Sequence, residues 1–294
     1  MDTKKSQRFI PQKRRSHIRV KLGVVFYCLV RYFAWFRFRK IFAHLEKNTD
    51  DSKIEALKKK FSFISVGHSS ILKRNLSPAD TALQEGKINN VSIASKKVNG
   101  IILEPGKVFS YWKSIGNPTK SKGYKNGMML VNGKPTAAIG GGLCALSNLI
   151  YWMTLHTPLT VIERYRHSYD VFPDPNRTRP FGSGATCVYN YRDLMIRNDT
   201  NQAYALLIWI ENDILKGEWR TENETSDFYQ VYQKDHWITA ETGGAYVRHN
   251  TIWRKHYYIE ENGEKRLIED KLIAENNALM MYEPLLEEKN GKIE

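Results

Sequence analysis

Cys144 and His167 are the residues whose types and spacing could best support chemistry. Gly140, Gly141 and Gly142 come just before Leu143-Cys144, and the apolar spacing that follows predicts a helix over residues 143–155. Unpaired N–H groups and the positive end of the helix dipole lower the pKa of a cysteine in a first turn. The pattern therefore favours a reactive thiolate at Cys144.

His167 follows 23 residues later, in a segment (160–169) whose alternating character predicts a strand. A cysteine and a histidine within hydrogen-bond reach supply the nucleophile and general base of acyl-transfer enzymes. The glycine N–H groups could then receive the oxyanion. The structural alternative is that the glycines allow close packing and that Cys144 is a buried core residue.

Arg164 and Arg166 stand next to the histidine, and two guanidinium groups there could hold a substrate carboxylate. The alternative is a solvated strand face. Cys144, His156, His167 and Cys187 lack the short spacing of zinc ligands, so we predict no metal site. No Gly-Lys-Ser/Thr follows the glycines, so we predict no nucleotide and no other cofactor.

Several further motifs occur in one order between about residues 62 and 215. They are Asn99-Gly-Ile-Ile-Leu-Glu-Pro-Gly-Lys-Val-Phe-Ser-Tyr-Trp112, Gly116, Gly123-Tyr124, Ile139-Gly-Gly-Gly-Leu-Cys144, Glu163-Arg164, His167-Ser168, Gly184-Ala-Thr186 and Asp193-Leu194. In these motifs the sequence resembles the VanW family, accessory proteins named for their occurrence with VanB-type vancomycin-resistance genes. The resemblance implies a role near cell-wall precursors in glycopeptide resistance, and it imports no mechanism.

Two positions depart from the family pattern. The family usually has Gln after the Cys and often Asp in a Gly-x-Asp-Ala-Thr segment, where this chain has Ala145 and Gly184. If the family residues form a transglutaminase-like triad, the orienting group must come from elsewhere. The candidates are Asp170, Asp174, Asn190 and Asp193, of which we favour Asp193.

The leading functional hypothesis follows from the motifs and the resemblance together. We expect a VanW-like accessory protein that acts on a peptidoglycan stem peptide or a lipid-linked precursor. Cys144 would be the nucleophile, His167 the base and Asp193 the orienting acid, in amide hydrolysis or transpeptidation. The alternative is a noncatalytic protein that binds a muropeptide or scaffolds a cell-wall enzyme.

The elements that must position these residues predict an α+β fold. The turn signals Asn132-Gly133, Gly243-Gly244 and Asn262-Gly263 indicate hairpins, and residues 185–191 and 205–210 resemble strands. We expect a single core domain with a central helix packed on mainly antiparallel sheet, plus a basic N-terminal helix. The expected divisions are a helical segment (1–50), the VanW-like core (51–222) and a β-rich extension packed on the core (223–294).

Positive charge is concentrated at the N-terminus. The formal net charge is +14, and residues 1–60 hold 17 Lys and Arg against 5 Asp and Glu, which leaves 28 against 26 for the rest. The nearly balanced body has no electrostatic footprint for nucleic acid, so we predict no nucleic-acid partner. Three cysteines do not make a disulfide framework, although a Cys144–Cys187 bridge stays open.

An apolar stretch over residues 22–30 is interrupted by Arg31, and no small-x-small site follows, so we expect no cleavable signal peptide. Extended past Arg31, the stretch falls short of the roughly 20 apolar residues that span a bilayer. Aromatic and basic residues over 18–44 favour a helix on the membrane surface. The alternative is a helix packed on the body. Basic residues on both sides of the stretch favour the cytoplasmic face.

Overall fold

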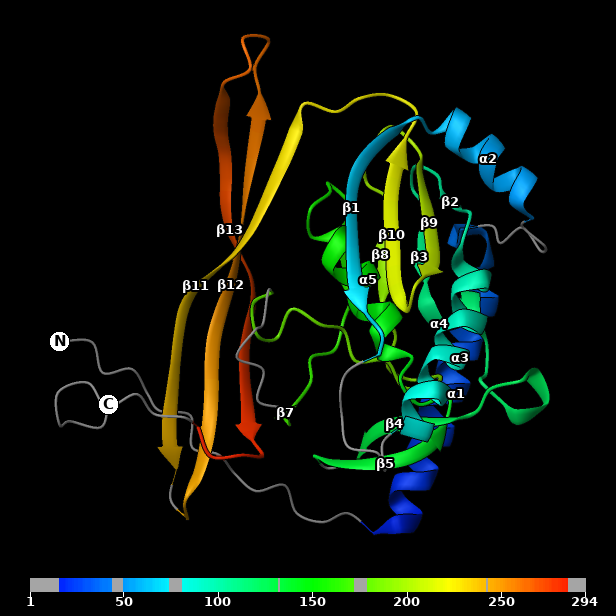
Figure 1. Cartoon of the computed structure of the whole chain (residues 1–294), viewed down its shortest axis with the longest axis vertical. Coiled ribbons are helices and arrows are strands. Elements are labelled where there is room, and N and C mark those ends of the chain that lie inside the picture. Colours follow the sequence, from blue (N-terminus) through cyan, green and yellow to red (C-terminus); the bar gives the residue numbers. More distant parts are fainter. Residues whose placement is uncertain are drawn as a thin grey trace, which may run out of the picture.

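The central sheet is antiparallel and carries one buried helix. The computed structural model describes residues 16–43, 50–73, 81–131, 133–171, 179–241 and 243–284. The sheet order is β1-β10-β9-β2, and helix α5 packs on β1 and β10 (Figure 1). The bounds are β1 (Phe63–Ile71), β2 (Ile101–Leu103), β9 (Tyr204–Glu211), β10 (Ile214–Thr221) and α5 (Cys144–Thr154). This arrangement confirms the predicted α+β fold and its central helix.

Apolar side chains at helical spacing explain why α5 lies there. Leu146, Leu149, Ile150 and Met153 are fully buried, as their spacing of three and four predicts. Trp219 of β10 is also buried, and its indole Nε1 donates to Thr154 Oγ1 over 3.2 Å. The core of the protein therefore forms between this helix and one face of the central sheet.

Further helices and strands surround this core. A helix, α3 (Thr81–Val98), lies beside the hairpin of β4 (Asn126–Val131) and β5 (Lys134–Ile139). A three-stranded sheet has the order β3-β8-β6. The remaining bounds are α2 (Asp51–Lys60), β3 (Val108–Ser110), α4 (Tyr111–Ile115), η3 (Lys120–Lys122), β6 (Thr160–Glu163) and β8 (Met195–Arg197).

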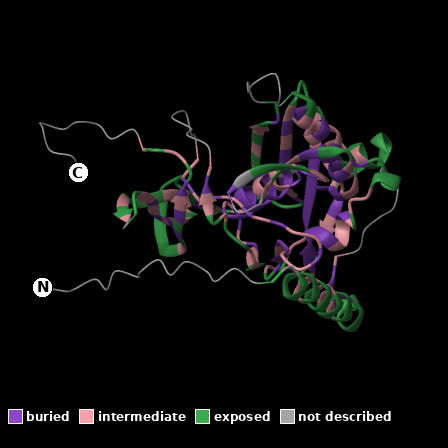
Figure 2. Cartoon of the chain, turned by 90° about the horizontal axis from the view of Figure 1, so that it is seen from below, coloured by how far each residue is buried: buried purple, intermediate pink, exposed green. Residues whose placement is uncertain are grey.

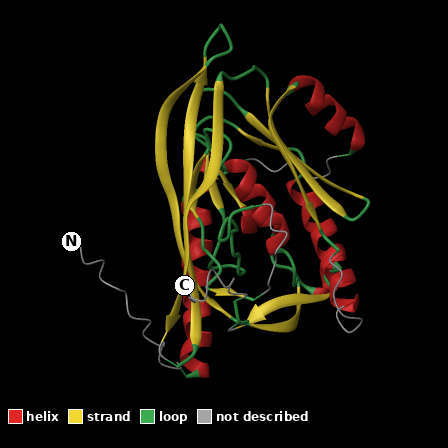
Figure 3. Ribbon diagram, turned by 60° about the vertical axis from the view of Figure 1, so that its left-hand side comes forward, coloured by secondary structure: helices red, strands yellow, loops and turns green. Residues whose placement is uncertain are grey.

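Three long strands form a separate sheet beside the body (Figure 3). They are β11 (Asp227–Glu241), β12 (Ala245–Ile259) and β13 (Lys265–Met280), and β7 (Tyr169–Asp170) pairs in parallel with the end of β13. Their antiparallel pairing confirms the hairpins predicted from the glycine turns. Asn250 Nδ2 donates to the Phe181 carbonyl over 2.7 Å, and Arg248 pairs with Asp170 at 3.1 Å. The division of the chain at residues 50 and 222 stays a prediction.

The N-terminal helix α1 (His17–Arg37), followed by η1 (Arg39–Ile41), lies along the outside of the body (Figure 2). One side of α1 meets the body: Arg31 pairs with Glu163, Tyr32 Oη lies 2.6 Å from Tyr189 Oη, and Trp35 is buried. The opposite side is exposed. Within the described residues, no helix is both long enough and apolar enough to cross a membrane.

Three local predictions were wrong or incomplete. The strand predicted over 160–169 ends at Glu163, so His167 lies on irregular backbone. Residues 185–191 form loops and turns with a single bridge from Val188 to Arg192. Helix α3 was not predicted, because the residues it buries include Gln84, Asn90 and Ser95.

Backbone contacts between glycines hold the α5 entry loop against the β4–β5 hairpin. A Cβ on Gly141 would stand 2.1 Å from the Gly127 carbonyl oxygen, and one on Gly127 would stand 2.3 Å from the Gly141 carbonyl oxygen. Such distances are far below van der Waals contact, and the atoms on both sides belong to the backbone. Only glycine at both positions permits this approach.

We predict that Gly141→Ala lowers the free energy of unfolding by about 3 kcal/mol or more, because the backbone must move to admit the methyl group. Gly67→Ala in β1 is the matched control, since its Cβ would meet its nearest neighbour at 3.6 Å. That variant should lie within about 1 kcal/mol of the wild type. Urea unfolding measures both, and equal stabilities would contradict the packing role of Gly141.

Candidate functional site

Cys144 stands at the first position of α5, as predicted, but its thiol is turned into the protein. The sulfur donates toward the Cys187 carbonyl over 3.9 Å. Burial raises the pKa of the Cys144 thiol, and hydrogen bonds with the backbone of Cys187 and Cys144 offset only part of that rise. Burial of the sulfur therefore opposes thiolate formation at this helix start.

The glycine loop uses part of its hydrogen-bonding capacity internally. Gly140 N–H donates to the Lys125 carbonyl over 3.1 Å, and Gly141 N–H donates to the Ala138 carbonyl over 2.9 Å. The Gly141 carbonyl accepts from Asn90 Nδ2 over 2.9 Å. A Cβ on Gly142 would meet the Lys87 side chain at 2.5 Å. These contacts favour the packing interpretation of the three glycines over an oxyanion site.

His167 is half-buried on the segment after β6. Burial, with a smaller effect from the nearby Arg164 charge, lowers the pKa of His167 to about 4. Within the described part of the chain, the imidazole makes no hydrogen bond, either to Cys144 or to Asp193. The ring is neutral at physiological pH and is a weaker base than an ordinary histidine.

Asp193 is fully buried and accepts hydrogen bonds from groups other than His167. Its carboxylate accepts from Ser110 Oγ over 2.5 Å, from Trp112 N–H over 3.0 Å and from Leu194 N–H over 2.9 Å. It therefore joins the first turn of α4 to the start of β8. Burial raises the pKa of Asp193 to about 6, although these hydrogen bonds and the Arg31 charge act in the opposite direction.

Glu163 connects the backbone of Asp193 to the N-terminal helix. Its Oε1 accepts from the Asp193 N–H over 3.1 Å, and both of its oxygens accept from the Arg31 guanidinium, at 2.5 and 2.8 Å. The Arg31 and Glu163 side chains are only 14% and 19% exposed. Sequence reasoning missed this network, because the partners lie 132 residues apart and Arg31 looked like an interruption in an apolar run.

Arg164 and Arg166 bind the protein's own backbone. Arg164 Nε donates to the Gly184 carbonyl over 2.9 Å, a second guanidinium nitrogen donates to Gly182, and its charge lies 5.0 Å from the Tyr151 ring centre. Arg166 donates to the Glu275 carbonyl over 2.8 Å. Arg164 thus fixes the loop at residues 182–184, whereas Arg166 fixes its own segment to strand β13.

The other described candidates for orienting the imidazole, Asp170 and Asn190, also form no hydrogen bond with His167. Asp170 pairs with Arg248 and accepts from Tyr282 Oη over 2.8 Å. Asn190 is fully buried, and both side-chain amide atoms lack a partner among the described residues. Asp174 lies outside the described residues. His156 Nδ1 lies 2.9 Å from the Trp152 carbonyl, and the described residues contain no cluster of three or more His, Cys, Asp or Glu that could hold a metal ion.

The fold and this region define an α+β protein whose glycine-led helix begins with a partly buried cysteine. A family model described as VanW like protein matches residues 86–220. The vancomycin B-type resistance protein VanW of Enterococcus faecalis (strain ATCC 700802 / V583) is 33% identical over 203 residues, which cover 69% of this chain and 72% of that protein. The chain belongs to the VanW family, which confirms the resemblance found in its motifs.

A second relative matches over a shorter stretch. The uncharacterized protein YoaR of Bacillus subtilis (strain 168) is 27% identical over 118 residues, which cover 40% of this chain and 37% of that protein. No solved structure matches the chain.

We predict that Asp193→Ala lowers the free energy of unfolding by about 3 kcal/mol, because three buried donors lose their acceptor. Asp199→Ala is the control, since Asp199 forms an exposed pair with Arg197 at 2.5 Å and should contribute less than about 1 kcal/mol. Chemical denaturation compares the two variants. Similar losses would show that the Asp193 hydrogen bonds have no special role.

The same residue gives the stability a defined pH dependence. The pKa of Asp193 is raised from 3.8 to about 6 in the folded protein, so the folded state binds the proton more tightly than the unfolded state. The stability of the wild type relative to Asp193→Asn should therefore fall as the pH rises from about 4 through 6. Urea unfolding of both proteins at several pH values measures this difference in the free energy of unfolding. A difference that does not change between about pH 4 and 6 would contradict the raised pKa of Asp193.

Proposed function

We propose that this protein is an accessory protein of glycopeptide resistance that recognises peptidoglycan or its lipid-linked precursors at the membrane surface, without using Cys144 as a nucleophile. The resistance role is supported by family membership and by the 33% identity to a protein named for vancomycin B-type resistance. The observation that carries the noncatalytic mode is the orientation of the Cys144 thiol toward the Cys187 carbonyl. The ligand would be a muropeptide or a precursor, and a cell-wall enzyme would be a second partner.

Each requirement of the acyl-transfer hypothesis meets an obstacle in the geometry. The pKa of Cys144 is raised, whereas a nucleophilic cysteine needs a lowered one. Two of the three glycine N–H groups already donate to carbonyls of the chain. Asp193 accepts hydrogen bonds from α4 and its surroundings and makes none with His167. The binding hypothesis needs none of these groups to be reactive.

The exposed side of α1 supports the membrane component of the proposal. Leu29, Phe33 and Phe36 are 63%, 67% and 69% exposed, and they continue a stripe with Leu22 and Phe26 at alternating spacings of three and four. This stripe lies opposite Arg31 and Trp35, which contact the body. One side of α1 is thus docked on the body, and the opposite side is apolar and exposed. A helix with this arrangement is suited to lie in a lipid interface.

Charge identifies the kind of lipid. Residues 16–43 contain no acidic residue, and Arg19, Lys21, Arg37, Arg39 and Lys40 are exposed. Basic side chains beside an apolar stripe are attracted to anionic headgroups. The proposed surface for α1 is therefore an anionic membrane, on the cytoplasmic face where lipid-linked precursors are made.

We predict that Cys144 reacts with iodoacetamide at pH 7 no faster than an ordinary exposed thiol, because its pKa is raised. Cys28 is an internal comparison, and mass spectrometry separates the two labelled peptides. Cys144→Ser should keep both its resistance phenotype and its binding to muropeptides. Rapid labelling at Cys144, together with loss of the phenotype in Cys144→Ser, would restore the acyl-transfer hypothesis.

We also predict that the chain sediments with vesicles containing phosphatidylglycerol and less with vesicles of phosphatidylcholine alone, in a salt-dependent way. The double variant Leu29→Glu, Phe33→Glu should bind the anionic vesicles about tenfold more weakly or worse, because it places charge in the lipid-facing stripe. Leu267→Glu is the control, since Leu267 is 50% exposed on β13. Equal binding by both variants would exclude α1 as the lipid contact.

A further inference from the structure

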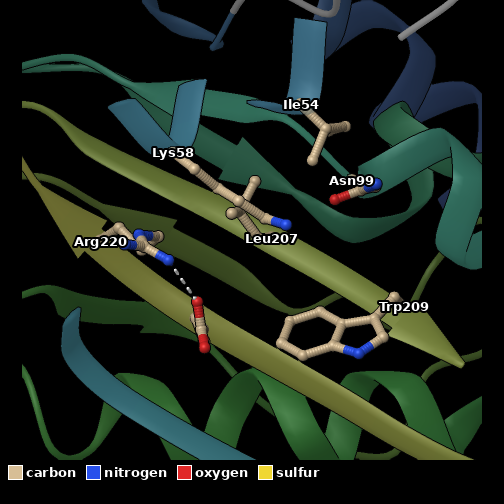
Figure 4. Close-up of a pocket in the computed structure, with 7 residues that line it drawn as sticks. Ile54, Lys58, Asn99, Leu207, Trp209 and Arg220 are labelled. Carbon is tan, nitrogen blue, oxygen red and sulfur yellow. Dashed lines mark hydrogen bonds and ion pairs between the residues drawn. The ribbon is translucent and has the colours of Figure 1, made fainter. Parts of the chain in front are cut away.

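A small pocket lies between helix α2 and the face of the central sheet that turns away from α5 (Figure 4). Its volume is about 270 Å³. Ligand pockets usually run from about 300 to 1,000 Å³, so this one suits a single ring-sized unit. The site residues predicted from the sequence do not line it. Its lining comes from β9 and β10, from α2, and from Asn99 just after α3.

One side of the pocket is apolar and carries a large aromatic ring. Leu207 and Trp209 come from the same face of β9, and Ile54 faces them from α2. Leu207 is buried, whereas Trp209 is half-buried. A partly accessible indole over an apolar base is the surface on which the C–H face of a sugar ring packs.

The cations of the pocket are already paired. Lys58 Nζ donates to Glu55 Oε1 over 2.7 Å. Arg220 donates from Nε to the Phe61 carbonyl over 2.7 Å and from its terminal nitrogens to Ser62 and Glu218 over 3.0 and 2.9 Å. A phosphate or carboxylate would have to displace one of these partners. The lining therefore favours a neutral ligand.

Two polar groups retain hydrogen-bonding capacity. Asn99 Oδ1 accepts from the Ile208 N–H over 2.9 Å, while its Nδ2 makes no hydrogen bond within the described residues. Glu218 uses Oε2 for Arg220, and its Oε1 has no partner among the described residues. The pocket thus offers one free amide donor and one free carboxylate acceptor. An acetamido group presents the complementary pair, a carbonyl acceptor and an N–H donor.

We propose that this pocket binds one N-acetylated sugar unit of the peptidoglycan glycan, with the ring packed on Trp209 and its polar groups bonded to Asn99 and Glu218. This inference rests on the proposed function and names the part of peptidoglycan that is recognised. The stem peptide and lipid portion of the ligand would extend out of the pocket.

Chitotriose, an N-acetylglucosamine trimer, is the probe, and cellotriose, which lacks acetamido groups, is the control sugar. We expect chitotriose to shift the indole N–H resonance of Trp209 and to bind at least about tenfold more tightly than cellotriose in calorimetry. Trp209→Ala should weaken chitotriose binding about tenfold or more. Ile54→Trp, which fills the pocket from α2 without altering the sheet, should do the same.

Trp237→Ala is the matched control, since Trp237 is 44% exposed on β11 and stacks on His249 at 5.0 Å between ring centres. The Trp237→Ala variant should bind chitotriose with the same affinity as the wild type. Absence of chitotriose binding, equal affinity for cellotriose, or loss in Trp237→Ala with retention in Trp209→Ala and Ile54→Trp would overturn the proposal.

Sedimentation with purified peptidoglycan distinguishes this inference from the proposed function. If Trp209→Ala and Ile54→Trp sediment as the wild type does, the pocket is not the sugar site and the proposed function stands. If the wild type binds chitotriose through Trp209 but sediments with neither peptidoglycan nor precursor-loaded vesicles, the proposed function is wrong and the sugar site stands.

Discussion

The arrangement of the body depends on one buried carboxylate. Asp193 accepts hydrogen bonds from the start of α4 and from the N–H of the next residue, Leu194. Its own backbone N–H donates to Glu163, which in turn pairs with Arg31 of α1. Segments that begin more than 80 residues apart are therefore fixed by one connected set of polar contacts. Because these groups are buried, removing any partner leaves another without compensation. The network is thus a structural constraint, and it explains why a residue in the family motif can matter without touching a substrate.

The parts of the fold that were predictable are those fixed by local chemistry. Helix α5 follows from apolar spacing, and the hairpins follow from glycines at turns, since both signals act over a few residues. Helix α3 was missed because its buried side carries Asn90, whose amide donates to the Lys125 and Gly141 carbonyls. A polar residue that is buried to satisfy a distant backbone has no periodic signature. The same reason explains the early end of β6, where Arg164 turns away to bind Gly182 and Gly184.

The sequence predicted which residues lie near the start of α5, but it did not predict which atoms they contact. The sequence placed Cys144 at a helix start correctly, and the dipole argument for a lowered pKa followed from that position alone. The structure adds burial, which raises the pKa of the Cys144 thiol. Similarly, the three glycines were expected near the thiol, but only the folded chain shows that Gly141 meets Gly127 backbone to backbone. Direction and burial of a side chain depend on segments far away in sequence, so spacing could not decide between a reactive and a packed cysteine.

The attachment of α1 has a geometric consequence for the whole molecule. A helix of 21 residues is roughly 30 Å long, and it is fastened to the body near its C-terminal half by an ion pair, a tyrosine contact and a buried tryptophan. A protein that rests on a surface along such a rod loses freedom to tilt, unlike one tethered by a flexible chain. The sheet formed by β11, β12, β13 and β7 lies on a different side of the body from α1 (Figures 1 and 2). If α1 lies on a membrane as proposed, the body that separates α1 from this sheet sets the distance and direction of the sheet from the lipid.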